Sequence, residues 1–324
     1  MASGIYKMAD FVSALNRRLD KIAENFSAII RLRLREVGPA RLILPPIHKA
    51  WKDLHRDPET QEMYDLMELE PEAFSEFAYV LTPKGEVLKK QIRGETVGVP
   101  IIQIATDEIE VNKAEAAAYP YSITQWLETN VIRDIEAMET RRLLMLAYSS
   151  ADAQGRAVGV SAWISFEAIL SEGISQFNKS ERTGVVHTIL MHQADFDKCL
   201  AQAMVNRDTL AMTILSQGWQ QTQLFGYNFL ITRKSTLLSP GVICIFASPE
   251  WLGQFTIVED AQFFIENKAK TFTWQVFEYV ALGIGNPNGI VVLANAGNDN
   301  IWDSANRKLR LDNLLKWPYP DGGL

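Results

Sequence analysis

Residues 120–149 read PYSITQWLETNVIRDIEAMETRRLLMLAYS and hold the strongest helical pattern of the chain. Pro120 and the run from Ser122 to Gln125 predict the helix start, because a capping box lets the serine and glutamine side chains satisfy the first free amides. Apolar residues then recur along one helical face, at Ile123, Leu127, Val131, Ile135, Met138 and Met145. At 1.5 Å per residue this helix is roughly 40 Å long. We therefore expect a strut that crosses a whole domain.

A second amphipathic pattern lies upstream, over residues 10–35, with Asp10 as its cap and Gly38-Pro39 as its end. Its apolar residues fall at steps of three and four: Phe11, Leu15, Leu19, Ile22, Phe26 and Ile29. Three arginines, Arg31, Arg33 and Arg35, follow. The simpler interpretation is a solvated helix end whose charges complement the helix dipole. The alternative is that these arginines contact nucleic acid.

Between the two helices the sequence predicts a β-hairpin. Two short β-rich runs, 77–81 and 87–92, flank a turn made of Thr82, Pro83, Lys84, Gly85 and Glu86. The hairpin is too polar to rest on a core, so we expect it to project and to hold on to a partner. An acid-only stretch, residues 62–76, precedes it and is interpreted as a solvated face.

The rest of the chain mixes strands and helices. A strand pattern covers residues 99–104 and continues through 109–111, and helices are predicted near 162–177, at 195–205 and on to 216. Strands are predicted at 185–191, 229–232, 241–247, 255–259, 271–280 and 289–294. This order is typical of an α+β fold and lacks the regular β-α-β alternation of a nucleotide-binding sheet. Residues after 295 are expected to form an extended tail.

Composition places the chain among globular proteins. It has 324 residues, 47% hydrophobic and 22% charged, which suffice for a large core without disulfides or metals. The net charge of −7 is uneven: residues 1–60 carry 11 bases and 7 acids, and residues 61–139 carry 6 bases and 16 acids. We expect no signal peptide and no membrane segment. Cys199 and Cys244 are interpreted as ordinary buried or half-buried thiols of a reducing compartment.

Candidates for catalysis are few. The run from Gly283 to Gly289 has the composition of a phosphate-binding loop, but a strand pattern follows it where a helix N-terminus is needed. His192, Asp195 and Asp197 could bring an imidazole near two carboxylates, yet Asp195 is better explained as a helix cap. His187 lies inside a strand pattern. The sequence therefore predicts no catalytic residue, no cofactor and no metal.

The order of elements resembles the Hong Kong 97 fold of the major capsid proteins of tailed double-stranded DNA bacteriophages. The resemblance covers roughly residues 60–295 and rests on layout: a basic arm, a projecting hairpin, a long capped helix, an α/β region and a β-rich end. It implies an N-terminal arm (1–70), an extended loop (71–98), a peripheral domain with its spine helix (99–154), an axial domain (155–250), peripheral return strands (251–295) and a C-terminal tail (296–324).

The resemblance also implies a function, which is assembly rather than catalysis. The subunit would form hexamers and pentamers of an icosahedral shell around packaged double-stranded DNA, bound without sequence specificity. A separate scaffolding protein, a portal protein and optionally a decoration protein would be its partners. The shell would belong to the virion and assemble in the host cytoplasm. Arg31, Arg33 and Arg35 would face the DNA or pair with the acidic stretch of a neighbour, and residues 82–86 would contact neighbouring subunits.

Three alternatives stay open at this point. An encapsulin-like nanocompartment would keep the shell and enclose a cargo enzyme instead of a genome. Another virion component, such as a tail protein, would form rings or tubes. A soluble α+β enzyme would build its site from His187, His192, Asp195 and Cys199, but it leaves the projecting hairpin and the arm unexplained.

Overall fold

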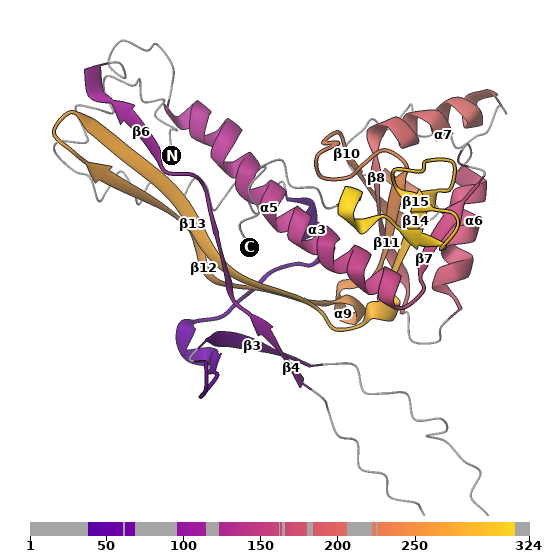
Figure 1. Ribbon diagram of the computed structural model, residues 1–324, viewed down its shortest axis with the longest axis horizontal. Helices are drawn as coiled ribbons and strands as arrows, with labels where there is room; N and C mark the ends of the chain where they lie inside the picture. The colour runs from indigo at the N-terminus through magenta and orange to yellow at the C-terminus, as the bar shows by residue number, and fades with distance from the viewer. Residues whose placement is uncertain are drawn as a thin grey trace, which may run out of the picture. The chain divides into compact units, whose positions relative to one another are not determined.

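The computed structural model describes residues 38–60, 62–68, 96–114, 123–161, 163, 166–179, 184–205, 222–224 and 226–314. The described residues group into two compact units (Figure 1). The first takes its residues from Met1–Asp65, Pro100–Leu146 and Gln254–Leu282. The second takes them from Leu66–Val99, Ala147–Gly253 and Gly283–Leu324.

A five-stranded sheet and a long helix form the first unit. The sheet runs in the order β1-β12-β13-β5, and β6 continues along the same edge of β13 as β5. Its strands are β1 (Ile47–His48), β12 (Gly253–Asn267), β13 (Thr271–Ile284), β5 (Ile102–Ala105) and β6 (Ile109–Asn112). The helices are α3 (Pro39–Ile43), the short 3-10 turn η1 (Trp51–Asp53) and α5 (Ile123–Ala153), which runs along β12 and β13 in Figure 1.

Alternation along β13 shows which face of this sheet is covered. Trp274, Val276, Glu278 and Val280 are buried, and the residues between them are only half-buried. Such a period of two is expected when one face of a sheet packs on a helix and the other does not. Because Glu278 falls in the buried set, this covered face holds a carboxyl group among apolar side chains.

A six-stranded sheet forms the centre of the second unit, in the order β7-β14-β11-β8-β10-β9. Its strands are β7 (Ala157–Val160), β14 (Ile290–Asn295), β11 (Val242–Ala247), β8 (Val186–His192), β10 (Tyr227–Thr232) and β9 (Thr222–Leu224). Helices α6 (Phe166–Phe177) and α7 (Gln193–Val205) belong to this unit. Gly173 lets α6 approach the sheet, because a Cβ there would press on Ile245 of β11 and Leu293 of β14. The core of this unit lies between the helices and these central strands.

The remaining elements are short. A three-stranded sheet has the order β2-β3-β4, with β2 (His55–Arg56), β3 (Met63–Glu68) and β4 (Thr96–Pro100). The others are α9 (Pro249–Leu252), η2 (Pro287–Gly289), β15 (Trp302–Asp303), β16 (Lys308–Leu309) and α10 (Leu311–Leu314). No helix within the described ranges is long and apolar enough to cross a membrane.

Most predicted elements are present, with longer strands than the pattern indicated. The long helix predicted at residues 122–149 is α5, and the α+β mixture is confirmed. The predicted strand over residues 99–104 is split between β4 and β5. The strands predicted at 255–259 and 271–280 extend to fifteen and fourteen residues as β12 and β13. The helical pattern over 10–35, the hairpin over 77–92 and the helix ending near 216 lie outside the described residues.

Two boundaries need correction. We expected residues 289–294 to return with β12 and β13, but β14 pairs with β11 and β7 in the six-stranded sheet of the second unit. The reason is its continuous apolar run, Ile290 to Ala294, which suits a central strand covered on both faces. The prediction of an extended tail was also wrong for residues 296–314. There β15 and β16 pair as a hairpin, and Ile301, Trp302 and Leu309 are buried.

The apolar stripe predicted for α5 was also incomplete. Val131 and Ile135 are buried as expected, whereas Met138 and Met145 are only half-buried. The buried band instead includes three polar side chains, Glu136, Glu139 and Thr140. A hydrophobic pattern cannot find such positions, because it counts a charged residue as solvent-facing.

Gly253 provides a test of the strand packing. A methyl group at this position would overlap the carbonyl oxygen of Gly283 and approach Ile284 Cα to 2.9 Å. Since both neighbours are backbone atoms, the two strands would have to separate. We expect Gly253→Ala to lower the free energy of unfolding by about 1–3 kcal/mol, measured by chemical denaturation. Gly297→Ala is the control, because its nearest neighbour would be Asn295 Oδ1 at 3.4 Å. Equal stability of the two variants would contradict this account.

Candidate functional site

The residues selected from the sequence as contacts with other molecules are not among those described. Thr82, Pro83, Lys84, Gly85 and Glu86 of the hairpin tip, and Arg31, Arg33 and Arg35 of the arm, all lie outside the described ranges. The structure does describe the segments that lead into them. Residues 38–60 follow the three arm arginines, and β3 and β4 flank the segment in which the hairpin is predicted. These roots, and what holds them, form the candidate functional site.

The arm root is held by a buried arginine. Pro39 occupies the first turn of α3, where its missing amide hydrogen costs nothing. Arg41 on this helix donates through Nε to both carboxylate oxygens of Glu139 at 3.0 Å, and through Nη2 to Glu139 Oε1 at 2.5 Å. The same Nη2 donates to Glu278 Oε2 at 3.1 Å. One guanidinium therefore connects α3, α5 and β13, and we call these three residues the Arg41 cluster.

All three members of the Arg41 cluster are withdrawn from water. Arg41 is 4% exposed, Glu139 is 1% exposed and Glu278 is fully buried. The guanidinium also lies over the Phe255 ring, with 6.0 Å between Cζ and the ring centroid. Two polar atoms, Arg41 Nη1 and Glu278 Oε1, are buried without a hydrogen-bond partner. Breaking such a cluster is costly, because the surviving charges cannot be hydrated.

The electrostatics of the Arg41 cluster are asymmetric. Burial works to lower the pKa of Arg41, but the hydrogen bond and charge of Glu139, followed by the charges of Glu278 and Asp260, outweigh it and raise that pKa. Burial raises the pKa of Glu278 well above its ordinary value, and Glu139 adds to the rise through its charge and a hydrogen bond. Arg41 opposes this rise only in part.

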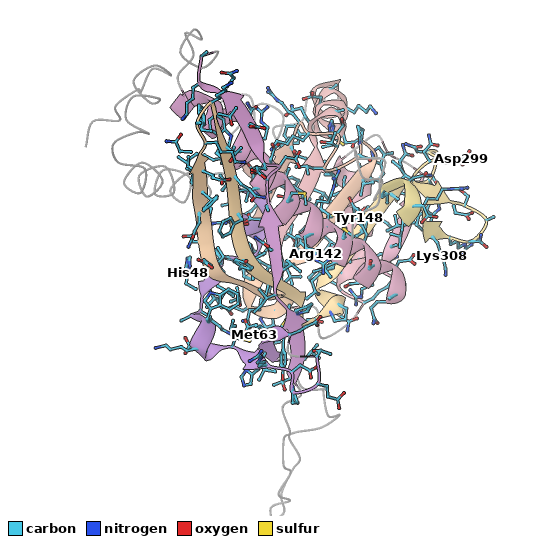
Figure 2. The ribbon with its side chains drawn as sticks, turned by 60° about the vertical axis from the view of Figure 1, so that its left-hand side comes forward. His48, Met63, Arg142, Tyr148, Asp299 and Lys308 are labelled. Carbon is cyan, nitrogen blue, oxygen red and sulfur yellow. The ribbon has the colours of Figure 1, made fainter. Side chains whose placement is uncertain are left out.

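The hairpin root is held by a second buried charge. Asp65 on β3 accepts from Lys49 Nζ at 2.7 Å, from Thr256 Oγ1 at 2.5 Å and from Gln254 Nε2 at 2.7 Å. Asp65 is 2% exposed, so the expectation that residues 62–76 form a solvated face is wrong at this position. His48, labelled in Figure 2, is the last residue of β1. The next residue, Lys49, is bonded to Asp65 of β3, and Asp65 is in turn bonded to Gln254 and Thr256 of β12.

The strands that flank the hairpin are also packed. Met67 of β3 and Val99 of β4 are buried and lie against Gly283 of β13, where a Cβ would come within 2.7 Å of Val99 Cγ2. Ile101 follows the last residue of β4, and its backbone N donates to the carbonyl oxygen of Met63, the first residue of β3. Residues 69–95, where the sequence predicts the hairpin, therefore follow one packed strand and lead into another.

The residues proposed for an enzyme site have structural roles in the second unit. Asp195 does not cap its helix as predicted; it accepts from Trp163 Nε1 at 2.9 Å and from Gly241 N at 2.6 Å. His187 contacts Thr188 and Asn228, and His192 Nδ1 accepts from Ala194 N. The His192–Ala194 bond lies at the junction of β8 and α7, and the contact of His187 with Asn228 joins β8 to β10.

Both cysteines are buried and free, as the sequence indicated. Burial raises the pKa of Cys199 to about 12, with a smaller contribution from the charge of Asp195. Burial also raises the pKa of Cys244, which Tyr148 opposes in part through a hydrogen bond. A nucleophilic cysteine needs the opposite shift. In the described part of the chain, no group of three or more His, Cys, Asp or Glu side chains could hold a metal ion.

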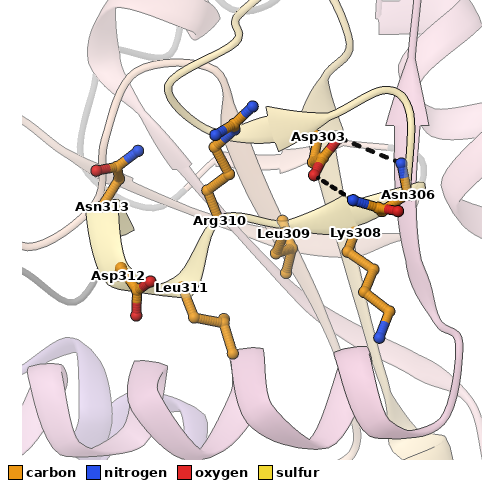
Figure 3. Close-up of a pocket in the computed structure, with 8 residues that line it drawn as sticks. All are labelled: Asp303, Asn306, Lys308, Leu309, Arg310, Leu311, Asp312 and Asn313. Carbon is orange, nitrogen blue, oxygen red and sulfur yellow. Dashed lines mark hydrogen bonds between the residues drawn. The ribbon is translucent and has the colours of Figure 1, made fainter.

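One surface hollow of about 620 Å³ lies beside β15, β16 and α10 (Figure 3). Its lining includes Asp303, Lys308, Arg310 and Asp312. Asp303 is held by Asn306, whose side-chain and backbone nitrogens donate to it at 2.8 and 3.2 Å. The residues that line the hollow come from β15, β16, α10 and the segments between them.

The sequence reasoning missed Arg41, Lys49, Asp65, Glu139 and Glu278. Its only signal for them was position: Glu139 lies at helical spacing from Ile132 and Ile135, and Glu278 alternates with Val276 and Val280. A charged residue that falls in phase with an apolar stripe is a candidate for burial with a partner. The partners themselves are 98 and 237 residues away from Arg41.

Comparison with known proteins identifies the fold. No protein-family model and no curated protein matches the sequence. Among solved structures, the virus-like particle from Pyrococcus furiosus matches with a TM-score of 0.52 and 12% identity, covering 84% of this chain and 99% of that one. The capsid of cyanophage P-SCSP1u matches with a TM-score of 0.51 and 11% identity, covering 78% and 90%. A structure from Mycobacterium phage Adephagia matches with 0.52 and 12%, covering 80% and 90%. The chain therefore has the Hong Kong 97 fold that its element order predicted.

The contribution of the Arg41 cluster to the free energy of unfolding can be tested by replacing Arg41. Arg41→Met keeps much of the apolar stem but removes the hydrogen-bond donor of Glu139 and Glu278 and the counter-charge of Glu139. We expect the free energy of unfolding to fall by about 3–5 kcal/mol, measured by chemical denaturation. Arg133→Met is the matched control, because Arg133 is an exposed residue of α5, and we expect it to change stability by about 0.5 kcal/mol or less. If both variants lose the same amount, the cluster does not hold the arm root.

Proposed function

We propose that this chain is a major capsid protein that self-assembles into an icosahedral shell around the double-stranded DNA genome of a tailed bacteriophage. The observation that carries the proposal is the likeness of its fold to a cyanophage capsid over most of both chains. The function is structural, so the proposal includes no catalytic residue and no cofactor. The protein would belong to the virion and would assemble in the host cytoplasm.

The two anchored roots support this proposal. In a thin shell, force passes between subunits through the segments that reach across them, so each reaching segment needs a fixed attachment in its own subunit. The arm would be attached through the Arg41 cluster, and the hairpin through Asp65. We infer that the tip residues 82–86 contact neighbouring subunits, and that Arg31, Arg33 and Arg35 face DNA or an acidic stretch of a neighbour.

Large apolar side chains left exposed by the described residues also favour assembly. In the first unit these are Leu42, Ile47, Trp51 and Phe264, with exposed fractions of 37%, 51%, 41% and 57%. Trp51 packs edge-on against Tyr279, with 5.3 Å between ring centroids, which presents a rigid aromatic pair. Tryptophan and tyrosine at such positions frequently anchor protein interfaces. We infer that this surface is buried between subunits.

The domain assignment that follows is also a proposal. Residues 1–70 would be the arm, 71–98 the extended loop, 99–154 the peripheral domain with α5 as spine helix, and 155–250 the axial domain. The return to the peripheral domain would end with β13 rather than at residue 295, since β14 belongs to the six-stranded sheet. The partners would be other copies in hexamers and pentamers, a separate scaffolding protein, a portal protein and, where present, a decoration protein.

A nanocompartment shell is the second candidate. It is favoured by the likeness to the virus-like particle from Pyrococcus furiosus, which matches the fold as well as the phage capsid does. Such a shell would enclose a cargo protein in place of a genome. The soluble-enzyme alternative receives less support, because Cys199 is a buried thiol and Asp195 is occupied by Trp163 and Gly241.

Electron microscopy tests the proposal directly. The full chain, co-expressed with its neighbouring genes so that a missing scaffold does not mislead, should form closed icosahedral shells tens of nanometres across. The ratio of nucleic-acid to protein absorbance in the same fractions, together with gel analysis of the contents, distinguishes a genome from a cargo protein. Compact small oligomers alone under these conditions would contradict any shell function.

The basic arm gives a second test. We expect simultaneous replacement of Arg31, Arg33 and Arg35 by Glu to reduce the yield of closed shells at least about tenfold, because the charge pairing with DNA or a neighbouring acidic stretch is reversed. Replacement of the same three residues by Lys is the control, since it keeps the charge. Sucrose-gradient fractions counted by electron microscopy provide the measurement. Normal shells from the Glu variant would exclude an electrostatic role for the arm.

A further inference from the structure

The Arg41 cluster holds one more negative group than its single cation can neutralise. Glu139 receives three hydrogen bonds from the guanidinium, whereas Glu278 receives one, at 3.1 Å. If both carboxyl groups were ionised, a net charge of −1 would be buried at 0–4% exposure. An uncompensated charge at such depth is strongly unfavourable, and a buried group normally takes up a proton instead.

Among the described residues, the charges that act on Glu278 include one cation, Arg41. From α3 it faces Arg41, from α5 it faces Glu139, and from β12 the charge of Asp260 acts on it. Glu136, one turn before Glu139 on α5, is a further acid beside the arm root, with its Cγ 3.5 Å from the position of a Cβ on Gly38. Among these groups only Arg41 is positive. Its Nη1 and Glu278 Oε1 are both buried without a hydrogen-bond partner.

We propose that Glu278 carries a proton in the folded subunit at neutral pH, and that loss of this proton in alkaline solution loosens the Arg41 cluster and frees residues 38–44. The proton leaves one carboxylate, Glu139, to pair with one guanidinium, and it lets the two carboxyl groups share a hydrogen bond. Deprotonation of Glu278 adds a negative charge beside Glu139, and the charge of Asp260 also opposes it. The helix α3, whose polar link to α5 and β13 runs through Arg41, then keeps only its apolar contacts, such as those of the buried Ala40 and Ile43. This property belongs to the single subunit and does not depend on the proposed shell function.

The sign of the pH dependence follows from the charge states. The pKa of Glu278 is raised in the folded protein by burial and by Glu139, so its contribution to stability is fully present below the ordinary glutamate pKa. That contribution is lost as the pH rises through the raised, folded-state pKa. Glu278→Gln resembles the protonated carboxyl group in shape and has no proton to lose. The variant should therefore lack this pH dependence.

The test compares melting temperatures of the full-length chain at about pH 5 and about pH 9. We expect wild type and Glu278→Gln to melt within about 1–2 °C of each other at the acid pH, and the variant to melt about 5 °C higher at the alkaline pH. Glu266→Gln is the matched control. Glu266 lies on β12, next to β13 in the sheet, and its carboxylate is exposed and pairs with Lys268. Its melting temperature should follow that of the wild type. All samples are kept in the same assembly state, checked by sedimentation.

Two further measurements assign the proton and the released segment. The infrared difference spectrum between wild type and Glu278→Gln should contain the carbonyl stretch of a protonated carboxylic acid at neutral pH. Amide hydrogen exchange of residues 38–44, compared at one alkaline pH so that the intrinsic exchange rate cancels, should be at least about threefold faster in wild type than in the variant. Glu139→Gln should be less stable than wild type at both pH values.

Three results would overturn the proposal. The first is parallel pH profiles for wild type and Glu278→Gln. The second is an alkaline gain in Glu139→Gln instead of Glu278→Gln, which would place the proton on the other carboxyl group. The third is equal exchange of residues 38–44 in wild type and variant, which would separate the protonation of Glu278 from the anchoring of the arm root.

Discussion

The contact between the Arg41 guanidinium and two buried carboxyl groups is the constraint on which the first unit depends. It brings together a short helix near the start of the described chain, the middle of α5 and the second half of β13. An apolar residue at position 41 could fill similar space but would give no direction to the contact. The planar guanidinium bonds its partners at set angles, so it fixes the orientation of α3 as well as its position.

The anchor at Asp65 differs from the Arg41 cluster in how well its charge and hydrogen-bonding atoms are matched. There the single carboxylate accepts from a lysine, a hydroxyl and an amide, so its charge is matched and both oxygens are satisfied. The Arg41 cluster is left with unsatisfied atoms on two of its three members. A fully satisfied buried network stabilises a structure over a wide range of conditions, whereas a partly satisfied one responds to the medium. The hairpin root is therefore the permanent attachment of the two, and the arm root is the adjustable one.

The sequence predicted the elements well where the signal was local. The capping box at Ser122 and the spacing of Val131 and Ile135 indicated α5, and the order of elements indicated the fold. Local patterns did not place β14, because an apolar run of five residues fits any buried strand, and its neighbours in the sheet depend on tertiary pairing. Nor could they show that Glu139 and Glu278 share one cation, since that pairing joins residues 98 and 237 positions away from Arg41. The candidate contacts chosen from the sequence, residues 82–86 and the three arm arginines, remain predictions.

These sequence separations matter during synthesis of the protein. Arg41 meets Glu278, and Asp65 meets Thr256 across 191 residues, so neither anchor can close until most of the chain has left the ribosome. At elongation rates of roughly 5–20 residues per second, Arg41 waits on the order of 10–50 s for Glu278. A nascent chain thus cannot present a fixed arm to a finished neighbour. The topology thus delays completion of both anchors until synthesis has passed residue 278 for one and residue 256 for the other.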